Sequence, residues 1–362
     1  MKFQENTLVA LNFFANINGN QTKNFLEYGG GLASSRIQLK PAIKAAESAG
    51  WTSQVWSLHS TNPKDLYRIP KARVCLIGKI SANTNSLIHN MTVANLAAVA
   101  HLKMTGSKII LLYSDNHIAD KSSLKDIYKD FAFFADAVVC PTKTLEKQFR
   151  SATNFQREIF VVEDPWSLAE YTYIKNTTSC LRLAWFGSSL NIPYLARELP
   201  KILDKKSVPF NFELSILSSK FAIQKLEAFV KKIEFDKTAY KINFIEWDDL
   251  KQPSQLKNLL IKSELALIPS DPKDPRKAGV SHNRLVDASR CGCIPIASPM
   301  ESYKELHKIA LIGDNFPLMI CYAYKNKIRL QQKYEALRGS MLSRFSPIEN
   351  NKKWLRLFQH FH

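Results

Sequence analysis

Short apolar runs alternate with amphipathic segments along the first half of the chain. The runs predict buried strands at Leu8–Ala15, Thr52–Leu58, Val74–Gly78, Lys108–Tyr113, Ala137–Cys140 and Ile159–Val162. The segments between them predict helices at Leu39–Ala49, Ser86–Met104, Leu124–Phe134 and Lys143–Ser151. This alternation is typical of a parallel α/β sheet that is covered by helices.

A polar stretch from Tyr171 to Cys180 separates this half from a second α/β series, which opens with a strand at Leu181. Further strands are expected at Phe212–Leu217, Lys241–Ile245, Leu265–Pro269 and Ile294–Ala297, and helices at Ala222–Ile233, Pro253–Lys262, Asn283–Cys291 and Tyr303–His307. A chain of 362 residues suits two such domains. We therefore predict domains at 1–168 and 178–345. A long basic helix is expected between Leu318 and Leu342, and a terminal amphipathic helix over 346–362.

The cysteines and the apolar runs indicate in which cellular compartment the protein is expected. Among the six cysteines only Cys291 and Cys293 lie close together, and no paired histidines accompany them. A zinc site is therefore not supported, and a reducing compartment fits best. No apolar run is long enough to span a bilayer, and the start of the chain lacks the pattern of a signal peptide. We expect a cytoplasmic protein.

The net charge of +18 calls for an anionic partner or a role in solubility. Nucleic acid, an anionic membrane face and an anionic substrate all fit such a charge. The basic residues are spread along the chain, with mild concentrations at Lys325–Lys333 and Lys352–Arg356. This spread, together with the absence of a recognition motif, argues against nucleic acid.

The strongest chemical signal is the stretch from Glu264 to Leu306, which predicts a buried strand, a polar loop, a helix and a second strand. The loop contains Arg276, Lys277 and Ser281, and the helix opens with Asn283 and Arg284. Ligands of parallel α/β sheets bind where strands lead into helices, and a helix N-terminus beside cations binds anions. The stretch is therefore a candidate pyrophosphate site, although a basic surface loop before a capped helix would have the same sequence.

This stretch resembles the donor-binding segment of GT-B glycosyltransferases, in particular the C-terminal donor domain of the family-four type. The features that match are the strand end Ala266–Ser270, Lys277, Asn283–Leu285, Asp287–Ala288 and Cys291–Ala297. The resemblance implies that Asp287 binds the ribose or sugar hydroxyls of the donor. Asp287 replaces a glutamate of the family motif, and Gly279 stands where the motif has its first acid.

Two further segments of the second half are similar to donor-binding elements of the same superfamily. Gly187 and Ser188 follow the strand that opens the second domain, where backbone amides can approach a phosphate. Glu246 and Trp247 stand at a strand end where the family often holds the nucleotide base, and Trp247 could stack on that base. A plain capped turn and a half-buried loop tryptophan are the alternatives.

In the first half, Asp115 and His117 follow the strand that ends at Tyr113 and are the candidate catalytic residues. An inverting transfer to a hydroxyl needs a base, which Asp115, or else His117, can provide. The alternative is a helix cap. The resemblance also implies acceptor-side roles for Gly30 and Gly31, near Arg36, while Lys79 ends a strand at the same sheet edge.

The resemblance implies a GT-B fold of two Rossmann-like domains facing across a cleft, with a C-terminal helix that can cross back to the first. It implies transfer of a hexosyl or ulosonic acid group from a nucleotide-sugar to a glycan or lipid-linked hydroxyl in surface polysaccharide or lipopolysaccharide synthesis. Without an Asp-x-Asp motif, no metal or other cofactor is expected, and cations would offset the charge of the leaving group. The basic charge predicts that the protein also contacts the anionic inner face of the membrane. The rival functions are a non-catalytic GT-B-like carbohydrate- or partner-binding protein and a nucleic-acid-binding protein.

Overall fold

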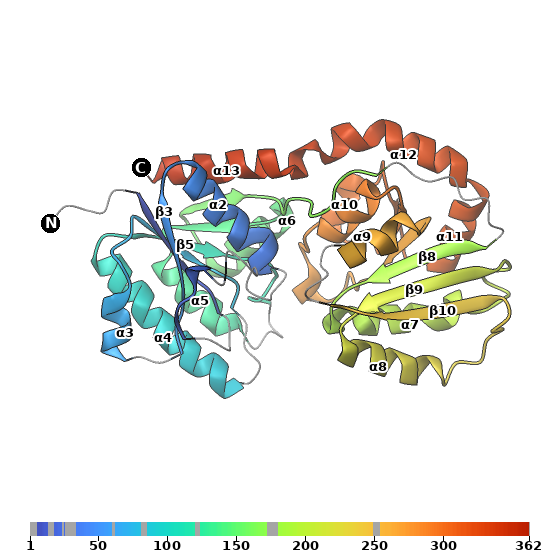
Figure 1. Ribbon diagram of the computed structural model, residues 1–362, viewed down its shortest axis with the longest axis horizontal. Helices are drawn as coiled ribbons and strands as arrows, with labels where there is room; N and C mark the ends of the chain where they lie inside the picture. The colour runs from blue at the N-terminus through green and yellow to red at the C-terminus, as the bar shows by residue number, and fades with distance from the viewer. Residues whose placement is uncertain are drawn as a thin grey trace. The chain divides into compact units, whose positions relative to one another are not determined.

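The computed structural model describes residues 6–13, 18–23, 25, 34–59, 62–80, 85–119, 124–171, 180–248 and 254–361. The chain divides into two compact units, and each is built on its own sheet (Figure 1). Unit 1 comprises Met1–Pro165, Ala278–Ser281 and Arg344–His362. Unit 2 comprises Trp166–Lys277 and His282–Ser343. The expected α/β class is confirmed in both units.

The described part of unit 1 contains a seven-stranded sheet in the order β2-β3-β1-β4-β5-β6-β7. Its strands are β1 (Thr7–Leu11), β2 (Gly19–Asn20), β3 (Thr52–Ser57), β4 (Val74–Ile77), β5 (Lys108–Leu112), β6 (Ala137–Cys140) and β7 (Glu158–Val161). Every pair is parallel except the short edge pair of β2 and β3. The carboxyl ends of β4 and β5, where Lys79 and Asp115 follow, therefore lie at the same edge.

Helices cover both faces of this sheet, as the continuous apolar strands require. They are α2 (Lys40–Ser48), α3 (Pro63–Arg68), α4 (Asn85–Met104), α5 (Lys125–Phe134), α6 (Lys143–Thr153) and α13 (Pro347–His360). Alternate residues of β1 serve the two faces: Val9 and Leu11 pack with residues of α4 and α5, while Leu8 and Ala10 pack with α2 and α13. The sequence pattern did not predict the short helix α3.

The C-terminal helix α13 belongs to unit 1, so the expectation that the terminal helix returns to the first domain is confirmed. Trp354, Leu357 and Phe358 are at most 1% exposed and share a hydrophobic cluster with α2. Helix α13 runs beside α2 in Figure 1. Trp354 and Phe358 stack at 5.9 Å between ring centroids. The amphipathic spacing of these side chains buries one face of α13 against unit 1.

Helix α13 begins with a hydrogen-bonded cap, and we predict that Ser346→Ala lowers the free energy of unfolding by about 1 kcal/mol. The Ser346 hydroxyl accepts a hydrogen bond from the Glu349 amide at 3.0 Å, and Pro347 occupies the first turn. Denaturant unfolding would measure the loss. Ser340→Ala is the matched control, because that hydroxyl only donates to the Leu337 carbonyl within α12. Equal effects of the two substitutions would contradict the prediction.

The described part of unit 2 contains a six-stranded parallel sheet in the order β10-β9-β8-β11-β12-β13. Its strands are β8 (Leu181–Phe186), β9 (Phe212–Ser218), β10 (Tyr240–Glu246), β11 (Leu265–Ile268), β12 (Ile294–Ala297) and β13 (Leu311–Ile312). The helices are α7 (Ile192–Ile202), α8 (Lys220–Val230), α9 (Ser254–Ile261), α10 (Asn283–Arg290), α11 (Phe316–Lys325) and α12 (Lys327–Leu342). Four of the six strands were expected within a few residues of these bounds, a fifth was expected to open at Leu181, and β13 was missed.

Three helical predictions for unit 2 need correction. The long helix expected between Leu318 and Leu342 is broken at Asn326, whose backbone leaves the helical range at ψ 15°. The segment expected as a helix at Tyr303–His307 is a 3₁₀ turn over Glu301–Leu306. Helix α7 was not predicted, because Pro193 and Pro200 interrupt its apolar pattern.

Helix α12 is fixed to the sheet of unit 2 through a buried carboxylate. Glu264 is fully buried just before β11, where it accepts hydrogen bonds from the Arg182 amide at 2.7 Å and from Lys327 Nζ at 2.7 Å. A buried carboxylate is stable only when such partners compensate its charge.

In the described part of the chain, no helix is both long and apolar enough to cross a membrane.

Candidate functional site

The strand order of unit 2 reverses between β8 and β11, which marks one position at the carboxyl edge of the sheet. From β8 the chain continues to β9 and β10 on one side, whereas β11, β12 and β13 lie on the other. Open parallel sheets bind ligands at the carboxyl ends of the strands where the order reverses. Gly187 and Ser188 follow β8 at this point, and the loop that contains Arg276 and Lys277 follows β11.

The structure brings Lys277 to the loop after β8. Lys277 Nζ donates to Asn191 Oδ1 at 3.3 Å, and Asn191 Nδ2 lies 3.4 Å from Ser188 Oγ. A Cβ at Gly187 would lie 3.4 Å from the Asn191 amide nitrogen and 3.2 Å from the Trp185 ring. Asn191, which sequence reasoning did not single out, therefore connects three predicted donor-site residues.

Arg276, by contrast, is already paired with an acid. Its Nε and Nη2 donate to both oxygens of Asp274 at 3.0 and 2.8 Å, and the Tyr194 hydroxyl donates to the same carboxylate at 2.9 Å. The guanidinium hydrogen bond is the main reason why the pKa of Asp274 falls to about 2. The charge of Arg276 is thus largely compensated, and its side chain is 57% exposed.

Arg284 differs from Arg276, because the residue is half-buried and one nitrogen of its guanidinium is enclosed. Its Nη1 is buried and makes no hydrogen bond to any of the described residues. The residue lies in the first turn of α10, where Asn283 Oδ1 accepts from its backbone amide at 2.8 Å. A buried cation without a partner is costly unless an anion binds it.

Asp287 is turned toward the start of unit 2. Its two carboxylate oxygens accept hydrogen bonds from the amide and the hydroxyl of Ser167, at 3.0 and 2.7 Å. The side chain is 6% exposed, and its burial raises the pKa of the carboxyl while the hydrogen bonds from Ser167 lower it. Both oxygens are therefore used to fasten α10 to the segment that opens the unit.

Glu246 and Trp247 lie at the end of β10 and are held there by Gln255. The Gln255 side chain donates to the Glu246 carbonyl at 2.9 Å and accepts from the Asp248 amide at 2.8 Å. The Trp247 amide donates to the Ser218 carbonyl at 2.7 Å, and its half-buried ring packs on a cluster with Leu217 and Leu256. Sequence reasoning missed Gln255, because a lone glutamine in a helix carries no motif.

The segment Ala278–Ser281 packs within unit 1, so Ser281 is not grouped with the other predicted donor-site residues. The Gly279 carbonyl accepts a hydrogen bond from Thr142 Oγ1 at 2.9 Å. Gly279 has a φ of 76°, and a Cβ there would lie 2.8 Å from the Leu145 backbone. No side chain fits this position, which gives a physical reason why glycine replaces the first acid of the family motif.

In unit 1 the two candidate catalytic residues and Lys79 come together. Lys79 Nζ forms an ion pair with Asp115 Oδ2, and His117 Nε2 lies 3.8 Å from the same oxygen. The His117 ring stacks on Tyr128 with centroids 4.9 Å apart. Asp115 is one-third exposed, so a substrate hydroxyl can approach its carboxylate.

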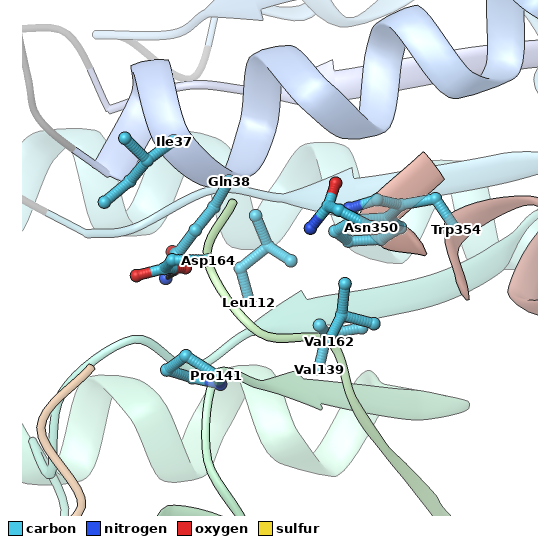
Figure 2. Close-up of a pocket in the computed structure, with 9 residues that line it drawn as sticks. All are labelled: Ile37, Gln38, Leu112, Val139, Pro141, Val162, Asp164, Asn350 and Trp354. Carbon is cyan, nitrogen blue, oxygen red and sulfur yellow. Dashed lines mark hydrogen bonds between the residues drawn. The ribbon is translucent and has the colours of Figure 1, made fainter. Parts of the chain in front are cut away.

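A polar network holds the turn that contains Asp115. The Ser114 hydroxyl donates to Gln38 Oε1 at 2.7 Å, and Gln38 Nε2 donates to Asp164 Oδ1 at 2.8 Å. Figure 2 shows Gln38 beside Asp164 in a small hollow above Leu112, Val139 and Val162, with Asn350 and Trp354 of α13 on its far side. On the other side of the turn, Asn116 donates to Gln148 Oε1 at 2.8 Å. These residues position the turn, and no sequence motif points to them.

Three predicted acceptor-side residues remain. Gly30 and Gly31 lie outside the described residues. Arg36 lies in the helical turn Ser35–Leu39 before α2, two residues from Gln38. Among the described residues, no group of three or more His, Cys, Asp or Glu side chains could hold a metal ion. The expectation of a metal-independent site stays a prediction.

Two sheets of this kind, each flanked by helices, with the C-terminal helix packed on the first, constitute the GT-B fold. HepE of Anabaena, solved in complex with UDP, matches with a TM-score of 0.61 and 11% identity over 98% of this chain and 100% of its own. A glycosyltransferase of Rickettsia africae matches with a TM-score of 0.63 and 10% identity over 99% of both chains. The lipopolysaccharide outer core galactosyltransferase WaaB matches with a TM-score of 0.59 and 12% identity over 98% and 99%.

Comparison of the sequence with protein-family models gives no match, and comparison with curated proteins gives none either. At identities near 10% the structural matches establish the fold, and the chemistry has to be argued from the residues of this chain.

Proposed function

We propose that the protein is a glycosyltransferase that moves a sugar from a nucleotide-sugar donor to a hydroxyl of a glycan or lipid-linked acceptor. The observation that carries this proposal is the pair of cations at the sheet edge of unit 2. Arg284 keeps a buried guanidinium nitrogen without a partner among the described residues, and Lys277 lies beside the loop after β8. A phosphate-bearing ligand is an anion that both cations can bind.

In this proposal unit 2 binds the donor. Lys277 and Arg284 contact its phosphates, and the amides after Gly187 approach them, because glycine leaves the backbone accessible. As the bond from the anomeric carbon to the phosphate oxygen breaks, the cations offset the charge that develops on the leaving group. Asp287 acts by fixing α10 through Ser167, and Gln255 orients the segment of Trp247 toward the base.

Unit 1 provides the acceptor chemistry in this proposal. Asp115 accepts the proton of the acceptor hydroxyl while the oxygen forms its new bond to the anomeric carbon, as an inverting transfer requires. Lys79 pairs with the Asp115 carboxylate and fixes its orientation. Gln38 holds the turn that contains Asp115, because it accepts a hydrogen bond from the Ser114 hydroxyl.

The donor is proposed to carry a nucleoside diphosphate or monophosphate, with a hexosyl or an ulosonic acid group. The UDP in the HepE structure supports the diphosphate, and the activity in the name of WaaB supports a surface glycan as acceptor. The net charge of +18 supports work at an anionic inner membrane face in the cytoplasm.

A nucleotide panel tests the proposal. We expect one of UDP, GDP, ADP or CMP to raise the melting temperature, since a ligand at 100 times its Kd adds about 2.7 kcal/mol of stability. The matching nucleotide-sugar should then release its nucleotide when glycan and lipid-linked acceptors are added. If no nucleotide shifts the melting temperature at millimolar concentration, the donor site is wrong.

The same panel separates an enzyme from a GT-B-like binding protein. A binding protein would be stabilised by a nucleotide-sugar or glycan but would release no nucleotide over time with any acceptor. Steeply salt-dependent binding of nucleic acid, without any response to nucleotides, would instead favour a nucleic-acid-binding protein.

A further inference from the structure

Helices α11 and α12 carry an unusual density of exposed apolar side chains. Of the eleven large hydrophobic side chains that lie exposed among the described residues, four are within residues 318–328. Leu318 is 65% exposed, Ile328 is 64% exposed and Tyr322 is 42% exposed, whereas Tyr324 lies on the other side of α11. Scattered single residues of this kind are normal, whereas a concentration indicates a contact surface.

The break at Asn326 brings the two helices to a common surface. Leu318 and Tyr322 are one turn apart on α11, so they share a face. On α12, Arg329 donates to the Tyr322 hydroxyl at 3.1 Å. Arg329 and its neighbour Ile328 therefore lie close to the face that Tyr322 shares with Leu318. We call Leu318, Tyr322, Ile328 and Arg329 the α11–α12 patch. It joins two aliphatic side chains to a tyrosine and a guanidinium.

The opposite side of α11 is firmly anchored in unit 2. Phe316 and Ile320 are at most 1% exposed, and Tyr324 stacks on Phe210 with centroids 4.0 Å apart. Cys321 Sγ contacts the Ser207 carbonyl at 3.4 Å. The patch is therefore presented by a fixed scaffold, and burying it elsewhere in the unit would require α11 to leave its core.

Cations outnumber acids around the patch. Residues 314–335 contain Lys325, Lys327, Arg329 and Lys333, and the acids Asp314 and Glu335 stand at the two ends of this segment. Lys327 is turned inward to Glu264, and the other three cations are at exposed positions. The excess of exposed cations favours an anionic partner over a second copy of the same surface.

We propose that the α11–α12 patch is a docking site for an anionic lipid surface. Aliphatic side chains enter the apolar boundary of a bilayer, tyrosine favours the headgroup level, and lysine and arginine attract anionic lipids. The patch has these three elements together on one rigid corner of unit 2. The proposal rests on the membrane contact in the proposed function and assigns it a surface, whose residues take no part in the donor or catalytic clusters.

Vesicle binding of the full chain tests this assignment. We expect binding to vesicles that mix phosphatidylglycerol with phosphatidylcholine, and little binding to phosphatidylcholine alone. The triple variant K325A/R329A/K333A should reduce partitioning on the order of 100-fold, because each cation near an anionic surface contributes about fivefold. The double variant L318E/I328E should lose binding to a similar degree.

Matched controls separate a docking site from general attraction by net charge. The variant K231A/K232A/K237A removes the same number of exposed cations from another part of unit 2. Phe133→Glu changes an apolar side chain on unit 1 that is 76% exposed. Both controls should bind vesicles within about fivefold of the unchanged protein, the contribution of a single cation.

Two outcomes would overturn the proposal: losses in the controls as large as in the patch variants, or no binding of the unchanged protein to anionic vesicles. A concentration-dependent dimer in sedimentation that disappears in L318E/I328E would instead assign the patch to a second copy. The nucleotide-induced rise in melting temperature should be the same in all variants. Failure of the lipid proposal is thereby distinguished from failure of the glycosyltransferase proposal.

Discussion

Asp115→Asn is expected to lower the rate of sugar transfer by ~10²- to 10⁴-fold, the range that a positioned general base contributes. The amide keeps the shape of the side chain but cannot accept the proton of the acceptor hydroxyl. Nucleotide binding should be unchanged, because the residue belongs to unit 1 and the proposed donor contacts lie in unit 2. Single-turnover kinetics with the donor found by the panel would measure the loss directly.

The control for this substitution is a second aspartate–lysine pair in the same unit. Asp136 accepts from Lys103 Nζ at 2.6 Å and from the Ile109 amide at 2.8 Å, at the opposite end of β5. Asp136→Asn should lower stability but leave the transfer rate of the folded protein within a fewfold. A rate for Asp115→Asn that stays within tenfold of the original would remove Asp115 from the chemistry, and His117→Gln would then be the variant to compare.

Arg284→Met is expected to weaken nucleotide binding on the order of 100-fold or more, because truncating one partner of a buried charge pair costs about 2–5 kcal/mol. Arg276→Met is the matched control, since the Asp274 carboxylate already compensates that guanidinium. Its effect on affinity should stay below tenfold. Calorimetric titration with the nucleotide that the panel identifies would give both values.

The stability of the Arg284 variant provides an independent readout. Its buried Nη1 has no hydrogen-bond partner among the described residues, so the free protein bears an uncompensated cost. Arg284→Met should therefore melt at the same temperature as the unchanged protein or higher, while it loses the shift caused by nucleotide. A variant that melts lower and still binds nucleotide normally would show that Arg284 is a structural residue. Such a gain in stability with a loss of function is common where active sites hold unpaired charge.

The elements of the fold were largely predictable because they are periodic. Strands such as β4, β6 and β11 are short and entirely buried, so their apolar runs are continuous and easily recognised. Errors arose where backbone geometry decides. Asn326 interrupts a segment whose side chains fit one long helix, and Pro200 conceals α7 although that helix accommodates it.

The candidate sites were predictable in part. Strand ends at one sheet edge correctly brought Lys79 to Asp115, because parallel strands align their carboxyl ends. From the sequence, Arg276 and Arg284 have the same expected role, since only the fold shows that Arg276 pairs with Asp274 while Arg284 keeps a buried nitrogen without a hydrogen bond to the described residues. It could not show that Ser167 occupies the Asp287 carboxylate, because that partner lies 120 residues away in the chain.

The return of α13 to unit 1 has a consequence for how the protein is made. Leu8, Ala10 and the inner face of α2 share their hydrophobic cluster with Trp354 and Phe358, which are synthesised only after all the residues of unit 2. During synthesis this side of the first sheet therefore stays open until unit 2 has been completed. The nascent first half exposes an apolar surface throughout that interval, when chaperones or premature self-association compete for it.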